Sequence, residues 1–139
     1  MIEIEIQGME ELERKLAHMP EKLNQLTRTT MEASLKALQQ NVPEYPPRPE
    51  TSKYVRTGML GRSLGAAGGK PTVYSIKGSG ANVVGTFGTN LSYAQYVIDD
   101  QRQAYMHKGR WWTMKTIVTN TKDKIINLWN LMIKRAIGS

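Results

Sequence analysis

The sequence predicts one α+β domain in which an antiparallel β-sheet packs against a long N-terminal helix and a C-terminal helix. Three observations lead to this prediction: period-two alternation at the N-terminus, helical spacing of apolar residues near both ends of the chain, and short β-prone runs separated by glycine in the middle. At 139 residues, of which 40% are hydrophobic, the chain can build a single core over 1–139.

The first element is a strand, because isoleucine alternates with polar residues from Ile2 to Gln7 and Gly8 ends the pattern. From Met9 the apolar spacing lengthens to three or four, which predicts a helix that ends near Asn41. Pro20 has no N–H to donate, so it starts a second helix or kinks a continuous one. The apolar stripe consists of Leu12, Leu16, Met19, Leu23, Leu26, Ala33, Ala37 and Leu38.

Four of the six prolines lie within 43–49, which predicts an irregular or polyproline-like connector. Between residues 57 and 90, β-prone runs alternate with glycine, and we expect them to form an antiparallel meander. The runs are Met59 to Leu64, "TVYSIKG" and "NVVGTFGTN". We expect a flexible, protruding loop or hairpin at about 65–80. Helical spacing returns from Ile117 to Ala136 and predicts the closing helix.

The net charge of +7 is unevenly distributed along the chain. Residues 1–50 carry nine acids and six Lys or Arg, whereas residues 51–139 carry three acids and thirteen Lys or Arg. This charge distribution suits a protein that faces a polyanion, or one that packs its acidic part against the basic part of an identical neighbour. A charged surface that is merely solvated, without a partner, is the third interpretation. The candidate DNA-facing residues, from a stretch without acids, are Lys53, Arg56, Arg62, Lys70 and Lys77.

The residues give little support for catalysis, and we predict no catalytic residue, metal or cofactor. The chain has no cysteine, and its two histidines, His18 and His107, match no zinc motif. The glycines lack a P-loop context, and no serine lies in a GxSxG elbow. His107 beside Lys108 and Arg110 leaves a small ribonuclease as one alternative. No apolar run approaches the roughly 20 residues of a membrane span, so we expect no membrane partner. The absence of cysteine fits a reducing compartment, and we expect assembly in a cytoplasm.

The stretch from Asn90 to Thr113 holds five of the ten aromatic residues, interleaved with cations. Aromatic rings and arginine are favoured at the centres of protein interfaces, and they also bind single-stranded nucleic acid. A monomeric, sequence-independent nucleic-acid-binding domain is therefore a second alternative. We expect an aromatic and basic loop at about 98–112, with Tyr93 and Val97 pointing inward and the part from Asp99 to Arg110 facing outward.

Three segments resemble the tail-completion or head-tail joining proteins of tailed bacteriophages, often called neck or minor tail proteins. They are "IEIQGMEELERKLAHMPEKL", "TGMLGRSL" and "FGTNLSYAQYV". With the closing amphipathic helix that the family also has, the resemblance spans nearly the whole length of the chain in order. The family pattern is TGxLxxS for the second and VGTNxxYAxYV for the third. After Val97 the chain departs from the family, because "IDDQRQAYMHKGRWWT" replaces a Gly-Thr loop and a proline-rich approach to the last helix.

The resemblance implies a non-enzymatic virion protein that is assembled in the host cytoplasm. Such proteins form a ring, commonly a hexamer, between the portal-proximal connector and the tail-tube proteins, and phage DNA passes through the ring with only transient, non-specific contact. In this reading Trp111 or Trp112 anchors a contact with a neighbouring subunit. The candidate interface residues are Tyr96, Arg102, Tyr105, His107, Lys108, Arg110, Trp111 and Trp112, with Glu10, Glu11 and Glu13 as acidic partners on the neighbour.

Overall fold

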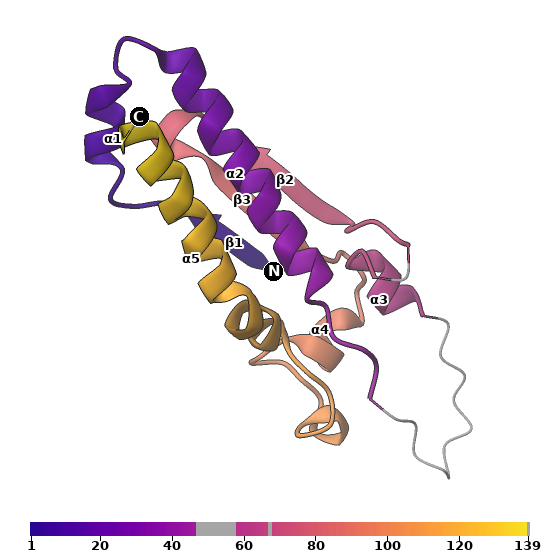
Figure 1. Cartoon of the computed structure of the whole chain (residues 1–139). Helices are drawn as coiled ribbons and strands as arrows, with labels where there is room; N and C mark the ends of the chain where they lie inside the picture. Colours follow the sequence, from indigo (N-terminus) through magenta and orange to yellow (C-terminus); the bar gives the residue numbers. More distant parts are fainter. Residues whose placement is uncertain (47–57, 67, 139) are drawn as a thin grey trace.

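A computed structural model describes residues 1–46, 58–66 and 68–138, and it confirms the predicted α+β class. The molecule is elongated, with α1 at one end and α4 and η2 near the other (Figure 1). The elements in order are β1 (Ile2–Glu5), α1 (Glu10–Lys15), α2 (Pro20–Gln40), α3 (Met59–Ser63), β2 (Val73–Lys77), the 3-10 turn η1 (Gly80–Asn82), β3 (Val84–Gly88), α4 (Ala94–Ile98), the 3-10 turn η2 (Tyr105–His107) and α5 (Met114–Gly138).

The three strands form one antiparallel sheet in the order β1-β3-β2, so β3 is central and the N-terminal strand joins the meander. Phe87 of β3 lies opposite Ile2 on one side and Tyr74 on the other. The same face of β3 carries Gly85, where an added Cβ would lie 2.5 Å from the Met31 sulfur of α2. The helix therefore rests directly on this strand.

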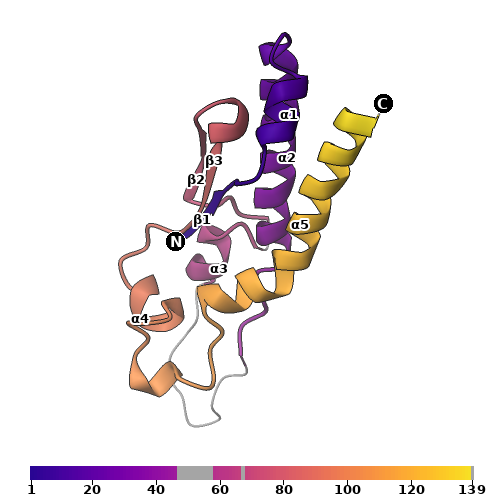
Figure 2. The ribbon, with the colours of Figure 1, turned by 90° about the vertical axis from the view of Figure 1, so that its left-hand side faces the viewer.

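Helices α1, α2 and α5 lie on one side of the sheet and leave its other face open (Figure 2). The long helices α2 and α5 run side by side, and Trp129 donates its indole N–H to the Ser34 hydroxyl across their interface, at 2.9 Å. Near one end of the same interface, the Asn41 side chain donates to the Thr121 hydroxyl at 2.9 Å. Pro20 stands in the first turn of α2, which confirms that the helical stretch is divided into two pieces.

The core lies between the sheet and these helices and is closed by large side chains with almost no exposed surface. Each fully buried aliphatic or aromatic side chain contributes about 1.5–3 kcal/mol to folding. The hydroxyl groups of Thr27 and Ser34 are also buried, and each donates to a carbonyl one turn earlier in α2. The largest buried apolar side chains are Phe87, Leu12, Met31, Leu35, Leu38, Leu64 and Ile117.

The prediction of a β-run from Met59 to Leu64 is wrong, because residues 59–63 form helix α3. Gly58 begins the helix with a φ of 77°, a left-handed conformation that favours glycine. Leu60 and Leu64, four residues apart, are both buried, so they lie on the face of this helical turn that points to the core. The other two runs form β2 and β3 as predicted.

A cluster of three hydroxyl groups joins α3 to the ends of β2 and β3. The hydroxyls of Ser63 and Thr89 lie 2.7 Å apart, and the Ser63 hydroxyl also lies 2.7 Å from the Leu60 carbonyl. Thr72 donates its backbone N–H to the Ser63 carbonyl at 2.8 Å, and its hydroxyl accepts the N–H of Asn90 at 2.9 Å. The TGMLGRSL and FGTN segments of the sequence therefore meet in space.

Within the predicted loop at 65–80, residues 73–77 are strand β2, and mobility of the remainder stays a prediction. None of the helices in the described parts of the chain has the length and apolar character that crossing a membrane requires.

Candidate interaction surface

The short helix α4 divides its aromatic and aliphatic residues between core and solvent. Ala94 and Ile98, four residues apart, are buried, whereas Tyr96 on the opposite side is 54% exposed. The expectation that Tyr93 points inward is wrong: it is 41% exposed, because the inward face of this turn is occupied by Ala94 and Ile98. Val97 is half-buried against the core.

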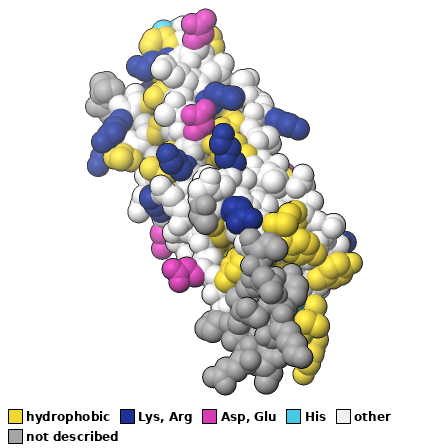
Figure 3. Space-filling view, turned by 90° about the vertical axis from the view of Figure 1, so that its right-hand side faces the viewer, with side chains coloured by type: hydrophobic (Ala, Val, Ile, Leu, Met, Phe, Trp, Pro, Cys, Tyr) yellow, Lys and Arg dark blue, Asp and Glu magenta, His cyan; other side chains and the backbone are white. Residues whose placement is uncertain are grey.

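Past α4 the chain forms a compact loop whose tip carries two of the most exposed large hydrophobic side chains in the described chain. Tyr105 is 92% exposed and Met106 is 69% exposed. We call Tyr93, Tyr96, Tyr105 and Met106 the tip surface. Hydrophobic side chains gather at this end of the molecule on the face in Figure 3, whereas Lys and Arg side chains are spread over its upper and middle parts.

Side-chain to backbone hydrogen bonds hold this loop in shape. One carboxylate oxygen of Asp99 accepts the N–H groups of Gln101 and Arg102, at 2.8 and 3.0 Å. The bond from Gln101 is the main reason why the pKa of Asp99 is lowered, so the turn favours the ionised carboxylate. The Gln103 amide donates to the carbonyls of Val97 and Trp111, at 2.7 and 3.2 Å, and joins the two ends of the loop.

Four rings form an aromatic cluster behind the tip: Tyr45, His107, Trp111 and Trp112. The centroid of Trp111 lies 5.1 Å from Tyr45, and 6.0 Å from each of His107 and Trp112. Trp112 donates its indole N–H to the Glu44 carbonyl at 3.1 Å. The Tyr45 hydroxyl accepts the N–H of Gly61 at 2.8 Å, so the cluster connects the loop to the segment after α2 and to α3.

The cluster gives both tryptophans contacts within their own chain. We predicted that one of them anchors a neighbouring subunit, and since both are half-buried, an intermolecular role for their remaining surface stays a prediction. The part played by Tyr45, Glu44 and Gln103 was missed in the sequence. The only sign of this aromatic cluster in the sequence outside the loop was the isolated aromatic residue Tyr45 between the prolines of the connector.

His107 sits at the edge of the cluster with its ring nearly perpendicular to that of Trp111, at 81°. Burial is the main cause that lowers its pKa, and the positive charge of Arg110 lowers it further. Its Nδ1 atom is buried and has no hydrogen-bond partner among the residues that the structure describes. The neutral ring is therefore favoured, and it packs as an aromatic side chain.

The acidic candidates Glu10, Glu11 and Glu13 are exposed on α1, at the far end of the molecule from the tip surface (Figure 1). They cannot pair with Arg102, Lys108 or Arg110 of the same chain, so such a contact requires another copy. Arg28 and Glu32 of α2, 3.7 Å apart, make the one ion pair found within the described residues.

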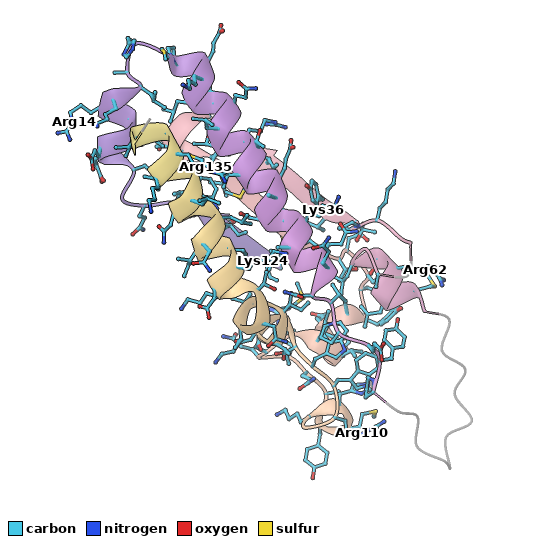
Figure 4. All side chains as sticks on the ribbon, viewed as in Figure 1. Arg14, Lys36, Arg62, Arg110, Lys124 and Arg135 are labelled. Atoms are coloured by element: carbon cyan, nitrogen blue, oxygen red, sulfur yellow. The ribbon has the colours of Figure 1, made fainter. Side chains whose placement is uncertain are left out.

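Of the basic candidates that the structure describes, Arg62 and Lys70 belong to neighbouring segments, because Gly69 packs against the backbone of Arg62. Arg62 is exposed on α3, at the right of the view in Figure 4. Lys77 is exposed at the end of β2, and Lys70 precedes that strand. Lys53 and Arg56 lie outside the described residues.

A groove of about 660 Å³ runs between α2 and β2. Two cations, Lys36 of α2 and Lys70, line it together with Tyr74 and Glu32. Burial is the main cause that raises the pKa of Tyr74, followed by the charge of Glu32, so the phenol stays protonated and can donate. Lys36 was not among the basic residues singled out in the sequence.

No three His, Asp or Glu side chains in the described ranges are placed to hold a metal ion. His18 lies in the turn between α1 and α2, at the opposite end of the molecule from His107 (Figure 1). The Ser63 hydroxyl is engaged by Leu60 and Thr89.

Comparisons with known proteins found no matching family model, no matching curated protein and no matching solved structure.

Proposed function

We propose that this chain is a structural protein of a tailed-phage virion that forms a homo-oligomeric ring at the neck, the junction between head and tail. The observation that carries the proposal is the tip surface, where large apolar side chains from α4, its N-cap and the braced loop that follows are exposed at one end of the molecule. Exposed patches of this kind mark interaction sites in soluble proteins. Tyrosine and methionine are also among the residues enriched at the centres of such sites.

The way the loop is held favours a contact surface over an active site. Asp99 and Gln103 fix its backbone, and the aromatic cluster supports it from behind, so the tip surface is presented with little conformational entropy left to lose on binding. His107, the candidate for acid–base chemistry, packs its ring against Trp111.

The hydroxyl cluster adds support from the segments that resemble tail-completion proteins. Ser63 ends the TGxLxxS element and Thr89 belongs to the GTN element, and their hydroxyl groups lie 2.7 Å apart. This contact explains why the TGxLxxS and GTN elements occur together in one chain, because each supplies one hydroxyl group to the same hydrogen bond. It does not depend on the divergent loop after Val97.

In this proposal the partners are further copies of the chain and the adjacent connector and tail-tube proteins. Arg62, Lys70 and Lys77 are exposed, so they can meet DNA phosphates in passing. A passage must let DNA slide, and we therefore expect weak, salt-sensitive binding without sequence preference.

Electron microscopy of the purified protein, together with tail-joining complementation in infected cells, tests the proposal. We expect closed rings with a central opening, and restoration of joined particles when the chain is supplied to a phage that lacks it. A protein that stays monomeric at high concentration and joins no tails would contradict the proposed function.

The groove between α2 and β2 favours one second candidate, a sequence-independent nucleic-acid-binding domain. Lys36 and Lys70 face the same hollow and could hold phosphate groups. Binding of duplex DNA by a monomer with submicromolar affinity at physiological salt would support this candidate. Replacing both lysines by glutamine should then reduce the affinity and its salt dependence, while Lys124→Gln on α5 serves as the matched control.

A further inference from the structure

The sheet has two open edges. β1 and β2 are its outer strands, and within the described residues the backbone of neither strand is hydrogen-bonded to anything except β3. Beside β2, the groove toward α2 leaves its helix-facing side partly uncovered, and Tyr74 is 43% exposed there. An unpaired strand edge carries a row of free donors and acceptors and is a template for pairing with another strand.

The central strand β3 shows how the two edges are aligned. Each of its residues from Val84 to Phe87 lies opposite one residue of β1 and one residue of β2. These two outer residues therefore stand at the same height along the strands, and their side chains point to the same face of the sheet. We call such a pair a row. The resulting rows are Ile2 with Tyr74, Glu3 with Ser75, Ile4 with Ile76, and Glu5 with Lys77.

The two members of each row are also chemically compatible. On the helix-covered face, the two rows, Ile2 with Tyr74 and Ile4 with Ile76, combine apolar side chains. On the open face, Glu5 shares a level with Lys77, and Glu3 shares a level with the hydroxyl group of Ser75. Within one copy the members of each row are separated by β3, about 9–10 Å from strand to strand. They become neighbours only if β2 of one copy lies beside β1 of the next.

The direction of the strands permits such a contact. β1 and β2 are both antiparallel to β3, so they run parallel to each other. If β2 of one copy lies beside β1 of the next without stagger, both copies keep the same orientation, as cyclic symmetry demands. The new strand pair is then parallel and brings the two members of all four rows side by side.

Within the described residues, the charged side chains on the open face form no ion pair inside one copy. Glu3 and Glu5 lie two residues apart on β1, and a hydrogen bond from the Glu3 carboxyl to Glu5, followed by the negative charge of Glu5, raises the pKa of Glu3. Lys77 is exposed, and no described acid forms an ion pair with it. A lysine placed beside this pair of carboxylates relieves their repulsion, and the carboxylates supply the counter-charge of the lysine.

We propose that β2 of one copy pairs in parallel with β1 of the next copy, in the register that sets Glu5 beside Lys77, so that the sheet continues across the subunit boundary. This inference rests on the proposed ring and names the surfaces that build it. The contact is heterologous, since two different edges meet, and it can therefore repeat until a ring closes.

Charge reversal tests the pairing by sedimentation velocity. Glu5→Lys places two lysines at each junction, and Lys77→Glu places two carboxylates there, so each variant alone should associate about tenfold or more weakly than the wild type. An equimolar mixture of the two should assemble again, because every junction between unlike copies restores one acid and one base. The control, Lys124→Glu on α5, should assemble like the wild type.

A disulfide gives a second, independent measurement, since the natural chain has no cysteine. Positions 5 and 77 of one copy are two strand spacings apart, beyond the roughly 7 Å that a disulfide can bridge between Cα atoms. A chain with Glu5→Cys and Lys77→Cys should therefore link only between copies, and oxidation should give a ladder of covalent oligomers that ends at the ring. Glu5→Cys with Lys124→Cys is the matched control and should give no ladder.

The outcomes separate this inference from the function on which it rests. Rings that form normally with either single reversal, or that give no ladder on oxidation, would overturn the edge pairing and leave the ring proposal standing. A wild-type protein that remains monomeric would overturn both. Circular dichroism of each variant checks folding, which should be unchanged because Glu5 and Lys77 are exposed.

Discussion

Replacing Trp111 and Tyr105 by alanine should separate the two tasks of the aromatic loop, which are to support its fold and to offer a contact. Trp111 packs against three other rings within its own chain. Tyr105 is 92% exposed. We therefore expect Trp111→Ala to lower stability, and Tyr105→Ala to weaken assembly without affecting stability.

The ring contacts determine the size of the first effect. Each aromatic pair contributes about 0.5–1.5 kcal/mol beyond the area it buries, and Trp111 makes three such pairs. A fully buried tryptophan costs about 3–5 kcal/mol when it is cut to alanine, and Trp111 is only half-buried. We expect a loss of about 2–4 kcal/mol, a large share of the roughly 5–15 kcal/mol that holds a domain together.

The second effect is on binding alone. Tyr105 has almost no buried surface to lose, so its replacement should change the free energy of unfolding by less than about 0.5 kcal/mol. At the centre of an interface an aromatic side chain contributes about 2 kcal/mol or more, which corresponds to association about 30-fold weaker. Tyr105→Phe keeps the ring and is the matched control.

Urea unfolding and sedimentation velocity on the same samples measure the two quantities. If Tyr105→Ala assembles as well as the wild type, the tip surface is not a subunit contact. If Trp111→Ala is as stable as the wild type, the aromatic cluster does not hold the loop. Trp112→Phe should fall between the two, because it keeps most of the ring and loses one hydrogen bond to the Glu44 carbonyl, worth about 1 kcal/mol.

Three further predictions concern the fold. Gly85→Ala should cost about 1–3 kcal/mol in thermal unfolding, because the new methyl group would lie 2.5 Å from a methionine sulfur of α2. Ser63→Ala and Thr89→Val should each cost about 1 kcal/mol, and a double-mutant cycle should show coupling, since the two hydroxyls bond to each other; strictly additive losses would refute the contact. The pKa of His107 is lowered in the folded state, so the unfolded chain binds more protons than the folded chain as the pH falls through the usual histidine range, and acid should lower the free energy of unfolding. His107→Gln should reduce this loss of stability in acid, measured by urea unfolding at several pH values. A variant with the same pH dependence of stability as the wild type would contradict the prediction.

The long elements were predictable from the sequence because each is stabilised by its own repeating pattern. The alternation of Ile2, Ile4 and Ile6 marks β1, and apolar spacing marks α2 and α5 over five or more turns. Helix α3 was missed because five residues hold too little of a period, and Leu60 and Leu64, four residues apart, share a face in a strand as well as in a helix.

The sequence showed where the aromatic residues concentrate, but not which of them face the core and which face solvent. The concentration of rings between Asn90 and Thr113 pointed to the segment that carries most of the aromatic cluster and the tip surface, and its role as a contact stays a prediction. Which rings would turn inward depends on Tyr45, more than sixty residues earlier, and the spacing of residues along a chain contains no information on such a distant contact. The alignment of Glu5 with Lys77 is of the same kind, because it exists only through the register of β3.

The shared direction of β1 and β2 has a consequence for how copies of this chain could be used. The strands run roughly along the axis that separates α1 from the tip surface (Figure 1). Any series of copies joined through both edges keeps one polarity, with every α1 at one rim and every tip surface at the opposite rim. Such an object has two chemically different ends, one with the acidic residues of α1 and one with exposed tyrosines, so it can be inserted between two unlike neighbours in one orientation only.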